Sequence, residues 1–366
     1  MKNTEKKDED LVKIVQRWWT GTARIKEIFR GAITRTHTGC GYPRLCCSRQ
    51  GGSCKRILRP LFKSTSDSED LAEAEEDKLL KLWEGLGYYN RVRNMQKAAQ
   101  QIMVDHEGIF PDTYEEILQL KGIGNYTAGA ISAFAYGIPK PAVDGNVLRV
   151  ISRITGSYED IMKQSVRKKI ENTLEQVIPS DAASDFNQGL IELGAIVCVP
   201  NGEPKCEECP VKEYCIACKE KLTTEIPVKK KAKTRKIEER TILIFKDGKR
   251  IAIRKRPAKG LLAGLYEFPN VEGKLSMDEV TEYSKTIGLM PVRVQELPEA
   301  KHIFSHIEWH MTGYEVIVDE LEKTNEEGFL FIHPEEIKKE YPIPSAFEKY
   351  TGYAGIGTVA IGKQWL

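Results

Sequence analysis

Apolar residues recur at three- and four-residue spacing through most of the chain from Asp70 to Ala217. The spacing is clearest over 69–103 and in TYEEILQL, which spans 113–120. Side chains three or four positions apart share one face of an α-helix, so this spacing predicts amphipathic helices. Few segments before residue 220 alternate as strands do. The N-terminal part of the chain is therefore expected to be mostly helical.

The pattern changes after a lysine-rich segment. We interpret 219–238 as a linker whose lysines are solvated or contact phosphates. RTILIFKDGKRIAIRKRP, at 240–257, then predicts a β-hairpin with an Asp-Gly turn, and HIFSHIEWHMTGYEVIV, at 302–318, continues the alternation of strands. Residues 239–366 are accordingly expected to form an α+β domain.

Composition limits the classes of protein that fit. The chain has 366 residues, enough for two domains, and a net charge of only +2, so nucleic-acid binding would depend on local patches. Its apolar runs are too short to span a membrane, and the N-terminus, MKNTEKKDEDLVK, is charged rather than signal-like. The 9 cysteines form an odd number without a secretion signal, which favours metal ligation over disulfides.

Four cysteines cluster in CVPNGEPKCEECPVKEYC, and they are Cys198, Cys206, Cys209 and Cys215. Four thiolates suit either Zn²⁺ or a 4Fe-4S cluster. The short gap in the middle favours zinc, whereas the long first gap and the wide closing gap are unusual for a zinc ribbon. Cys218 lies just outside the cluster and is interpreted as a bystander.

Two further motifs lie upstream of the cysteines. LKGIGNYTAGA, at 120–130, predicts a helix end, a turn containing Gly122 and Gly124, and a new helix. Backbone N–H groups at a helix start attract anions, and glycine lets a DNA phosphate approach, although alone the pattern is only a helical hairpin. Asp144, in VDGNV, would in isolation be an N-cap. Its place about twenty residues after the hairpin and upstream of the cysteines counts against a purely structural role.

These motifs, in this order, resemble the helix-hairpin-helix DNA glycosylases that carry an iron–sulfur cluster, and within them the adenine DNA glycosylases of the MutY type. The matching segments are WEGLGYYNRVRN (83–94), GIGNYTAGAI (122–131), VDGNVLRV (143–150), FNQGLIELGA (186–195) and RPAKGLLAGLYEFP (256–269). The resemblance runs from about Glu69 to the C-terminus, and the first cysteine gap is one residue longer than the commoner family spacing. It implies a mostly α glycosylase domain over 1–218 and a Nudix-like α+β domain over 239–366.

The resemblance implies removal of adenine mispaired with 8-oxoguanine or guanine, after the base is turned out of the duplex. A carboxylic acid should protonate the leaving base, and a carboxylate should stabilise the positive charge on the sugar. Asp144 matches the second role. Gly122, Gly124 and Asn146 are expected to bind the DNA. Tyr126 occupies the position of the nucleophilic lysine of lyase relatives. Because a phenol cannot form a Schiff base, the chain is expected to be monofunctional, with Tyr126 lining the site.

The resemblance also assigns roles outside the catalytic centre. Tyr88 matches the family aromatic that wedges into the base stack, with an ordinary core tyrosine as the alternative. Phe304, Ser305 and His306 match the loop that senses 8-oxoguanine. The sequence after Phe268 lacks the magnesium-binding box that Nudix hydrolases use to hydrolyse pyrophosphates. This domain is therefore expected to recognise 8-oxoguanine and not to be a hydrolase. The four clustered cysteines are expected to hold a 4Fe-4S cluster.

The general acid of the family is missing from the sequence. It lies in Ser-Glu-Ile-Met-Leu-Gln-Gln-Thr, preceded by Leu-Pro-Trp-Arg, and neither segment occurs here. Codons for GYPRLCCSRQ, at 41–50, can be read from the third base as Val-Ser-Glu-Ile-Met-Leu-Gln-Gln-Thr, and the same offset turns IFRGAITRTH into Leu-Pro-Trp-Arg-Asn-His-Lys-Asp-Pro. We therefore interpret 25–68, which has no periodic pattern, as translated out of frame. Pro43 overlaps the codon of the expected glutamate.

Two other functions stay open. An endonuclease III-type glycosylase/lyase would need a lysine at the position of Tyr126 and would lack the Nudix-like domain. A catalytically dead DNA-binding protein would bind a duplex without releasing a base, as the missing acid predicts. We expect a monomer in the cytoplasm (at the nucleoid in a bacterium) that binds double-stranded DNA with adenine:8-oxoguanine or adenine:guanine mispairs and no membrane.

Overall fold

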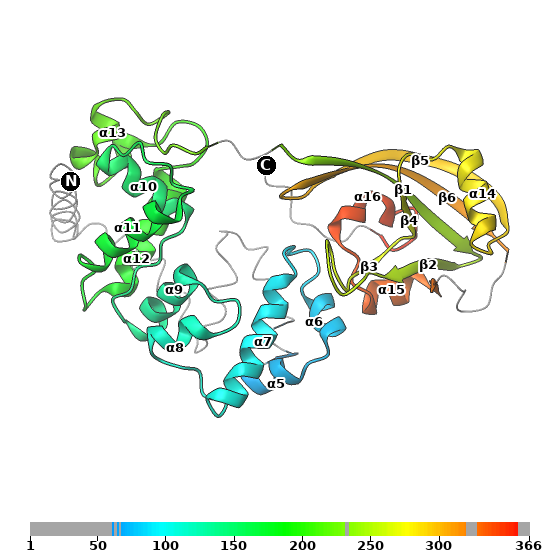
Figure 1. Cartoon of the computed structure of the whole chain (residues 1–366), viewed down its shortest axis with the longest axis horizontal. Helices are drawn as coiled ribbons and strands as arrows, with labels where there is room; N and C mark the ends of the chain where they lie inside the picture. Colours follow the sequence, from blue (N-terminus) through cyan, green and yellow to red (C-terminus); the bar gives the residue numbers. More distant parts are fainter. Residues whose placement is uncertain (1–60, 62–63, 66, 231–233, 320–327, 358–366) are drawn as a thin grey trace. The chain divides into compact units, whose positions relative to one another are not determined.

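The computed structural model describes residues 61, 64–65, 67–230, 234–319 and 328–357 (Figure 1). Pro43 and almost all of the segment interpreted as out of frame lie outside these residues, so that interpretation stays a prediction. The chain divides into two compact units, the first with described residues from 104–230 and the second with described residues from 61–103 and 234–357. None of the described helices is long and apolar enough to cross a lipid bilayer.

The first unit is helical, as the spacing of apolar residues predicts. Its elements are α8 (Tyr114–Gln119), α9 (Asn125–Tyr136), α10 (Gly145–Thr155), α11 (Gln164–Glu175), α12 (Ala183–Glu192), the π-helix η1 (Leu193–Val197), the 3-10 turns η2 (Cys206–Glu208) and η3 (Lys212–Tyr214), and α13 (Ile216–Lys219). α10 forms the centre of the core, because every residue from Val147 to Ile154 is buried. Its apolar side chains pack against Leu174 of α11 and Phe186 of α12.

The second unit begins with three helices, α5 (Ser68–Glu73), α6 (Glu76–Leu82) and α7 (Asn90–Asp105), and α7 extends into the first unit. The Asp67 side chain accepts a hydrogen bond from Asp70 N at 2.9 Å and so caps α5. Trp83 follows α6 and is only 1% exposed. The turn between α6 and α7 therefore starts from a buried aromatic anchor.

The remainder of the second unit is a mixed sheet. Its strands are β1 (Lys236–Asp247), β2 (Arg250–Lys255), β3 (Tyr266–Glu267), β4 (Asn270–Glu272), β5 (Pro291–Ile303), β6 (Ile307–Val318) and β7 (Leu330–Ile332), and its helices are α14 (Met277–Thr286), α15 (Pro334–Glu340), η4 (Ser345–Phe347) and α16 (Glu348–Thr351). The strand order is β3-β2-β1-β6-β5, with β4 also paired to β1 and β7 to β2. β1 and β6 run parallel, and the other pairs are antiparallel.

Side chains of β1 alternate between two core layers. Ile242 and Ile244 pack in the cluster that contains Phe347 of η4, whereas Leu243 and Phe245 pack with Val280 of α14. Figure 1 shows α14 on one side of the sheet and α16 on the other. A strand covered on both faces reads as a continuous apolar run, which explains TILIF at this position.

The predicted fold class, a mostly helical part followed by an α+β domain, is confirmed. The predicted hairpin turn connects β1 to β2, but its two loop residues are Gly248 and Lys249, because Asp247 is the last residue of β1 and pairs with Arg250. Gly248, the first of the two, has a positive φ of +57°. The alternation predicted over 302–318 is interrupted, because β5 ends at Ile303 and β6 begins at Ile307. β1 starts inside the segment expected to be linker, since Lys236 already pairs with Ile307.

Candidate functional site

Asp144 lies at the start of α10 and organises its first turn. Its Oδ1 accepts hydrogen bonds from the backbone N–H groups of Asn146 and Val147, each at 2.8 Å. Its Oδ2 accepts from the side-chain amide of Asn146, also at 2.8 Å. This is the N-cap role, and it holds the carboxylate in one orientation. Asp144 is thus structural and at the same time available as a fixed negative charge.

Tyr126 lies in the first turn of α9, where the negative charge of Asp144 affects its phenol. The pKa of its phenol is raised, first by burial and then by the negative charge of Asp144. The hydroxyl is therefore neutral at ordinary pH. The helix α9, which carries Tyr126, packs main chain to main chain against the segment that leads to Asp144, and Asp144 accepts a hydrogen bond from the Asn146 side chain. The catalytic and DNA-binding roles of these residues stay predictions.

The hairpin between α8 and α9 leaves a helix start open. Gly122 has a φ of +79°, which glycine adopts without strain. Gly124 is the N-cap of α9, and a Cβ added there would meet no described heavy atom within 4 Å. The first turn of α9 contains no acidic residue. Exposed N–H groups at the positive end of a helix suit a phosphate oxygen.

Main-chain packing holds α9 against the segment that leads to Asp144. A Cβ added at Gly129 would lie 2.0 Å from the carbonyl oxygen of Pro141, so only glycine fits there. The next residue, Ala142, donates its N–H to Oδ1 of Asn187 at 2.7 Å. The segment before Asp144 is therefore fixed between α9 and α12.

Two buried arginines of α10, which the sequence analysis missed, reach the cysteine loop. Arg149 donates to Oδ1 of Asn146 at 2.9 Å. It also donates to the carbonyl oxygens of Gly194 and Cys198, at 2.7 and 2.8 Å. Arg153, one turn later, lies 3.2 Å from Sγ of Cys198. The sequence does contain a signal for them, because two arginines four positions apart lie inside the apolar pattern VLRVISRI. Charged side chains at buried positions need hydrogen-bonded partners, so the pattern indicates polar contacts in the core.

One cavity gathers the clustered thiols, and its cysteines are Cys198, Cys206, Cys209, Cys215 and Cys218. Cys218, interpreted as a bystander, thus lines the same cavity. Burial raises the pKa of Cys209 to about 12 and that of Cys206 to about 11. Without a positive centre these thiols stay protonated, and iron would supply the positive charge that replaces the protons.

The donor set around this cavity is made of thiols. Four thiolates can hold either a zinc ion or a 4Fe-4S cluster. In a 4Fe-4S cluster each cysteine binds a different iron, so cysteines that line one cavity fit such a group.

Tyr88 lies on an exposed turn between α6 and α7. Its side chain is 63% exposed, which is not the position of a core tyrosine. Gly85, Gly87 and Tyr88 all have positive φ, and Tyr88 at +48° is held in a conformation that is unusual for a bulky residue. The indole N–H of Trp83 donates to the carbonyl oxygen of Gly87 at 2.9 Å and supports the turn.

Phe304, Ser305 and His306 form the turn between β5 and β6. The N–H of Phe304 donates to the carbonyl oxygen of Ile307 at 2.8 Å and closes the turn. The Phe304 ring packs edge-on against Trp309, with centroids 4.9 Å apart. Ser305 and His306 are exposed, so their polar groups are accessible to a ligand.

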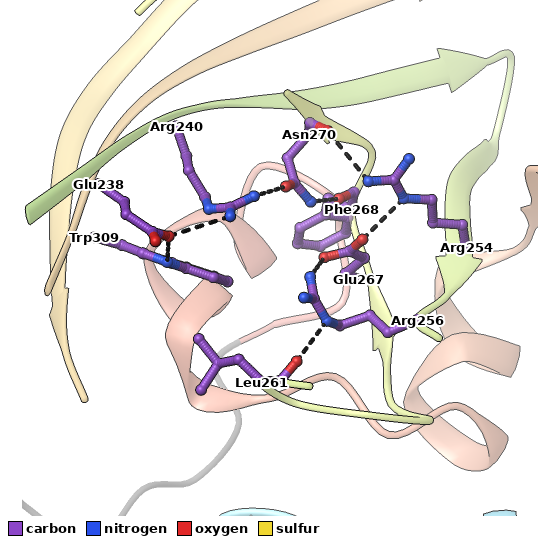
Figure 2. A network of polar contacts seen from close by, with 9 residues as sticks. All are labelled: Glu238, Arg240, Arg254, Arg256, Leu261, Glu267, Phe268, Asn270 and Trp309. Carbon is purple, nitrogen blue, oxygen red and sulfur yellow. Dashed lines mark hydrogen bonds and ion pairs between the residues drawn. The ribbon is translucent and has the colours of Figure 1, made fainter. Parts of the chain in front are cut away.

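Figure 2 shows a polar network around Trp309 that the sequence analysis did not single out. The indole N–H donates to Glu238 at 3.1 Å, and the Arg240 guanidinium lies over the ring at 4.5 Å. Glu267, almost fully buried, is paired with Arg254 at 2.8 Å and with Arg256. A buried carboxylate needs such partners to offset its desolvation.

Comparisons with known proteins give consistent results. The family model for the HhH-GPD superfamily base excision DNA repair protein matches residues 50–178, and the NUDIX domain model matches 240–352. The adenine DNA glycosylase of Buchnera aphidicola (subsp. Acyrthosiphon pisum) is 34% identical over 252 residues, which cover 69% of each chain. That of Schizosaccharomyces pombe is 31% identical over 328 residues, covering 75% of this chain and 71% of the relative. A solved thermostable thymine-DNA glycosylase superposes with a TM-score of 0.47 at 26% identity, covering 59% of this chain and 99% of that one.

Proposed function

This chain belongs to the adenine DNA glycosylase family of base-excision-repair enzymes, and on that premise we propose that its substrate is adenine mispaired with 8-oxoguanine or guanine in double-stranded DNA. The observations that carry the proposal are the Asp144 carboxylate, held in one orientation by the first turn of α10, and the main-chain packing of α9 against the segment that leads to it. Phosphate held at the start of α9 would bring the sugar of a flipped nucleotide towards the carboxylate.

The chemistry follows from the charges that develop. As the bond between C1′ of the sugar and N9 of adenine breaks, the electron pair leaves with the base, and a proton on the ring makes the base a better leaving group. Positive charge grows on the sugar, and the Asp144 carboxylate stabilises it until water adds to C1′. Tyr126, as a neutral phenol, cannot form a Schiff base with the sugar. The proposed reaction is therefore monofunctional hydrolysis.

We assign a 4Fe-4S cluster to Cys198, Cys206, Cys209 and Cys215. When bound, it would cross-link the four cysteines and so order the loop that contains them. Arg149 and Arg153 bond to Cys198 and also belong to the helix that Asp144 caps. The loop that holds the cluster is thereby connected to the helix that carries the catalytic charge.

Cys209→Ala should abolish most of the bound iron, because a four-iron cluster that loses one ligand becomes exposed and labile. Iron and acid-labile sulfide per chain, measured on protein purified without oxygen, give the readout. Cys218→Ala is the matched control and should keep the parent's iron content. Equal iron in the Cys209→Ala protein and the parent would contradict the assignment.

The proposed substrate is tested by binding, which does not need a general acid. The chain should bind a duplex with one adenine:8-oxoguanine pair at least about tenfold more tightly than the same duplex with adenine:thymine, a difference of about 1.4 kcal/mol. Both dissociation constants are measured at one salt concentration, because phosphate contacts weaken as salt rises. Equal affinity for the two duplexes would rule out mispair recognition by this chain.

A further inference from the structure

Two charged side chains near the end of α6 bind main-chain groups at and beyond the end of α15. Lys81 Nζ donates to the carbonyl oxygens of Tyr341 at 3.0 Å and Ile337 at 3.4 Å. Glu84 Oε1 accepts from the N–H of Ile343 at 2.8 Å, and its Oε2 accepts from Lys81 Nζ at 2.8 Å. We call these interactions the α6–α15 contact. All of its residues belong to the second compact unit.

The α6–α15 contact has a clear electrostatic basis. α15 ends at Glu340, and the last carbonyl groups of a helix carry partial negative charge, which Lys81 complements. Glu84 accepts from an N–H group just beyond this helix and neutralises Lys81. The side chains of Lys81 and Glu84 are only 17% and 14% exposed. Removing either would leave the other as a poorly solvated charge.

Other contacts extend along the same helices. The Asp77 carboxylate accepts from Lys255 Nζ at 2.7 Å and from the Tyr266 hydroxyl at 3.3 Å. Arg93 of α7 donates to the carbonyl oxygen of Ala263. The pair of Asp77 and Lys255 is more exposed, and exposed ion pairs contribute little. The α6–α15 contact and the bond from Arg93 to Ala263 are therefore the less exposed of these contacts.

Glu84 also begins the turn that presents Tyr88. It follows the buried Trp83, whose indole N–H bonds to the carbonyl oxygen of Gly87. The turn is thus held at its start by Glu84 and from beneath by Trp83. Through Glu84 it is connected to the domain whose β5–β6 turn carries Ser305 and His306.

We propose that Glu84, together with Lys81, is a positioning residue for mispair recognition. It fixes the Tyr88 turn to the sheet domain, so that the wedge and the Ser305–His306 turn engage the same base pair together. The inference rests on the proposed function, because the roles of Tyr88 and of the β5–β6 turn come from it. Loss of the contact should then lower discrimination between duplexes without lowering affinity for DNA in general.

The experiment uses the full chain and measures whether Tyr88 unstacks the bases beside the mispair. A duplex with adenine opposite 8-oxoguanine carries 2-aminopurine next to the 8-oxoguanine, and the fluorescence of this base rises when its neighbour is unstacked. The parent should raise the fluorescence on binding. Glu84→Ala should lose most of the rise, and its preference for the mispair over adenine:thymine should fall about tenfold, as expected when hydrogen bonds to a charged group are lost. Its affinity for the adenine:thymine duplex should stay the same.

Companion variants separate positioning from folding. Glu84→Gln keeps an acceptor for the Ile343 N–H and should recover part of the fluorescence rise. The double variant Lys81→Ala/Glu84→Ala should be no worse than Glu84→Ala alone, because the two residues act as one unit. Glu73→Ala, which removes an exposed carboxylate at the end of α5, is the matched control and should behave as the parent.

The outcomes distinguish the two proposals. A parent that neither discriminates the mispair nor raises the fluorescence would overturn the proposed function and this inference with it. Suppose that the parent and the Glu84→Ala protein both discriminate the mispair and both raise the fluorescence, and that the variant only melts at a lower temperature. This result would overturn the positioning role alone. In that case the α6–α15 contact only stabilises the fold.

Discussion

Single-turnover incubation of this chain with an adenine:8-oxoguanine duplex should leave the adenine attached. A positioned general acid contributes roughly 10²–10⁴-fold to such a rate, and Pro43 stands where that acid is expected. A chain in which residues 25–68 are replaced by the shifted reading should therefore release adenine roughly 10²–10⁴-fold faster. Abasic sites, detected as strand breaks after alkali, measure the release for both proteins.

Matched variants test the cause of the difference. Pro43→Glu alone should restore nothing, because the residues on either side would still differ from the family motif. In the restored chain, glutamine in place of the recovered glutamate should return the rate to that of the present chain. Ordinary release by the present chain would show that another residue serves as the acid. An intact single frame in independent reads of a functional gene would refute the out-of-frame interpretation itself.

Asp144→Asn in the restored chain should lower the rate of adenine release about 10²–10³-fold, because the electrostatic stabilisation of the sugar cation is lost. The same substitution should cost less stability than removal of the cap, because asparagine is as good an N-cap as aspartate. Its NH2 group, however, cannot accept the hydrogen bond that Oδ2 takes from the Asn146 side chain. Asp144 Oδ1 accepts from two backbone N–H groups, and an asparagine oxygen can accept both. Release under single-turnover conditions and the thermal midpoint are measured on the same preparations.

Asp144→Ala separates the two roles of this residue. It should lose the activity and also about 0.5–2 kcal/mol of stability, because the cap disappears with the charge. An Asp144→Asn protein that keeps the parent rate would show that Asp144 is only a cap. A protein that loses rate and stability together on Asn substitution would show that its effect on rate comes from the fold.

Local sequence patterns predicted those features that depend on neighbouring residues. The continuous apolar run of β1 and the Asp-Gly pair after it predicted the hairpin of 240–255. The glycines of 122–124 predicted the turn between α8 and α9. The four cysteines could be recognised as a group because they lie together in one segment, 198–215. The N-cap role of Asp144 follows from its local pattern, whereas its proposed catalytic role came from its place between motifs and from the resemblance.

Features that depend on distant residues could not be predicted in this way. Arg149 donates hydrogen bonds to the carbonyl oxygens of Gly194 and Cys198, which lie far along the chain. The residues next to Arg149 in the sequence do not predict these partners. Glu84 likewise accepts from Ile343, 259 positions away. Alternation continues through HIFSHIEWH and does not reveal the break between β5 and β6, because the turn depends on main-chain bonding; only the resemblance placed a loop at Phe304, Ser305 and His306.

The close approach at Gly129 has a consequence for substitution near the site. The helix α9 and the segment that leads to Asp144 touch main chain to main chain, and a Cβ at Gly129 would overlap the carbonyl oxygen of Pro141. Even a methyl group there would push the two segments apart, and the Asp144 carboxylate would move with its segment. The most sensitive residue beside the site is therefore one that has no functional group of its own.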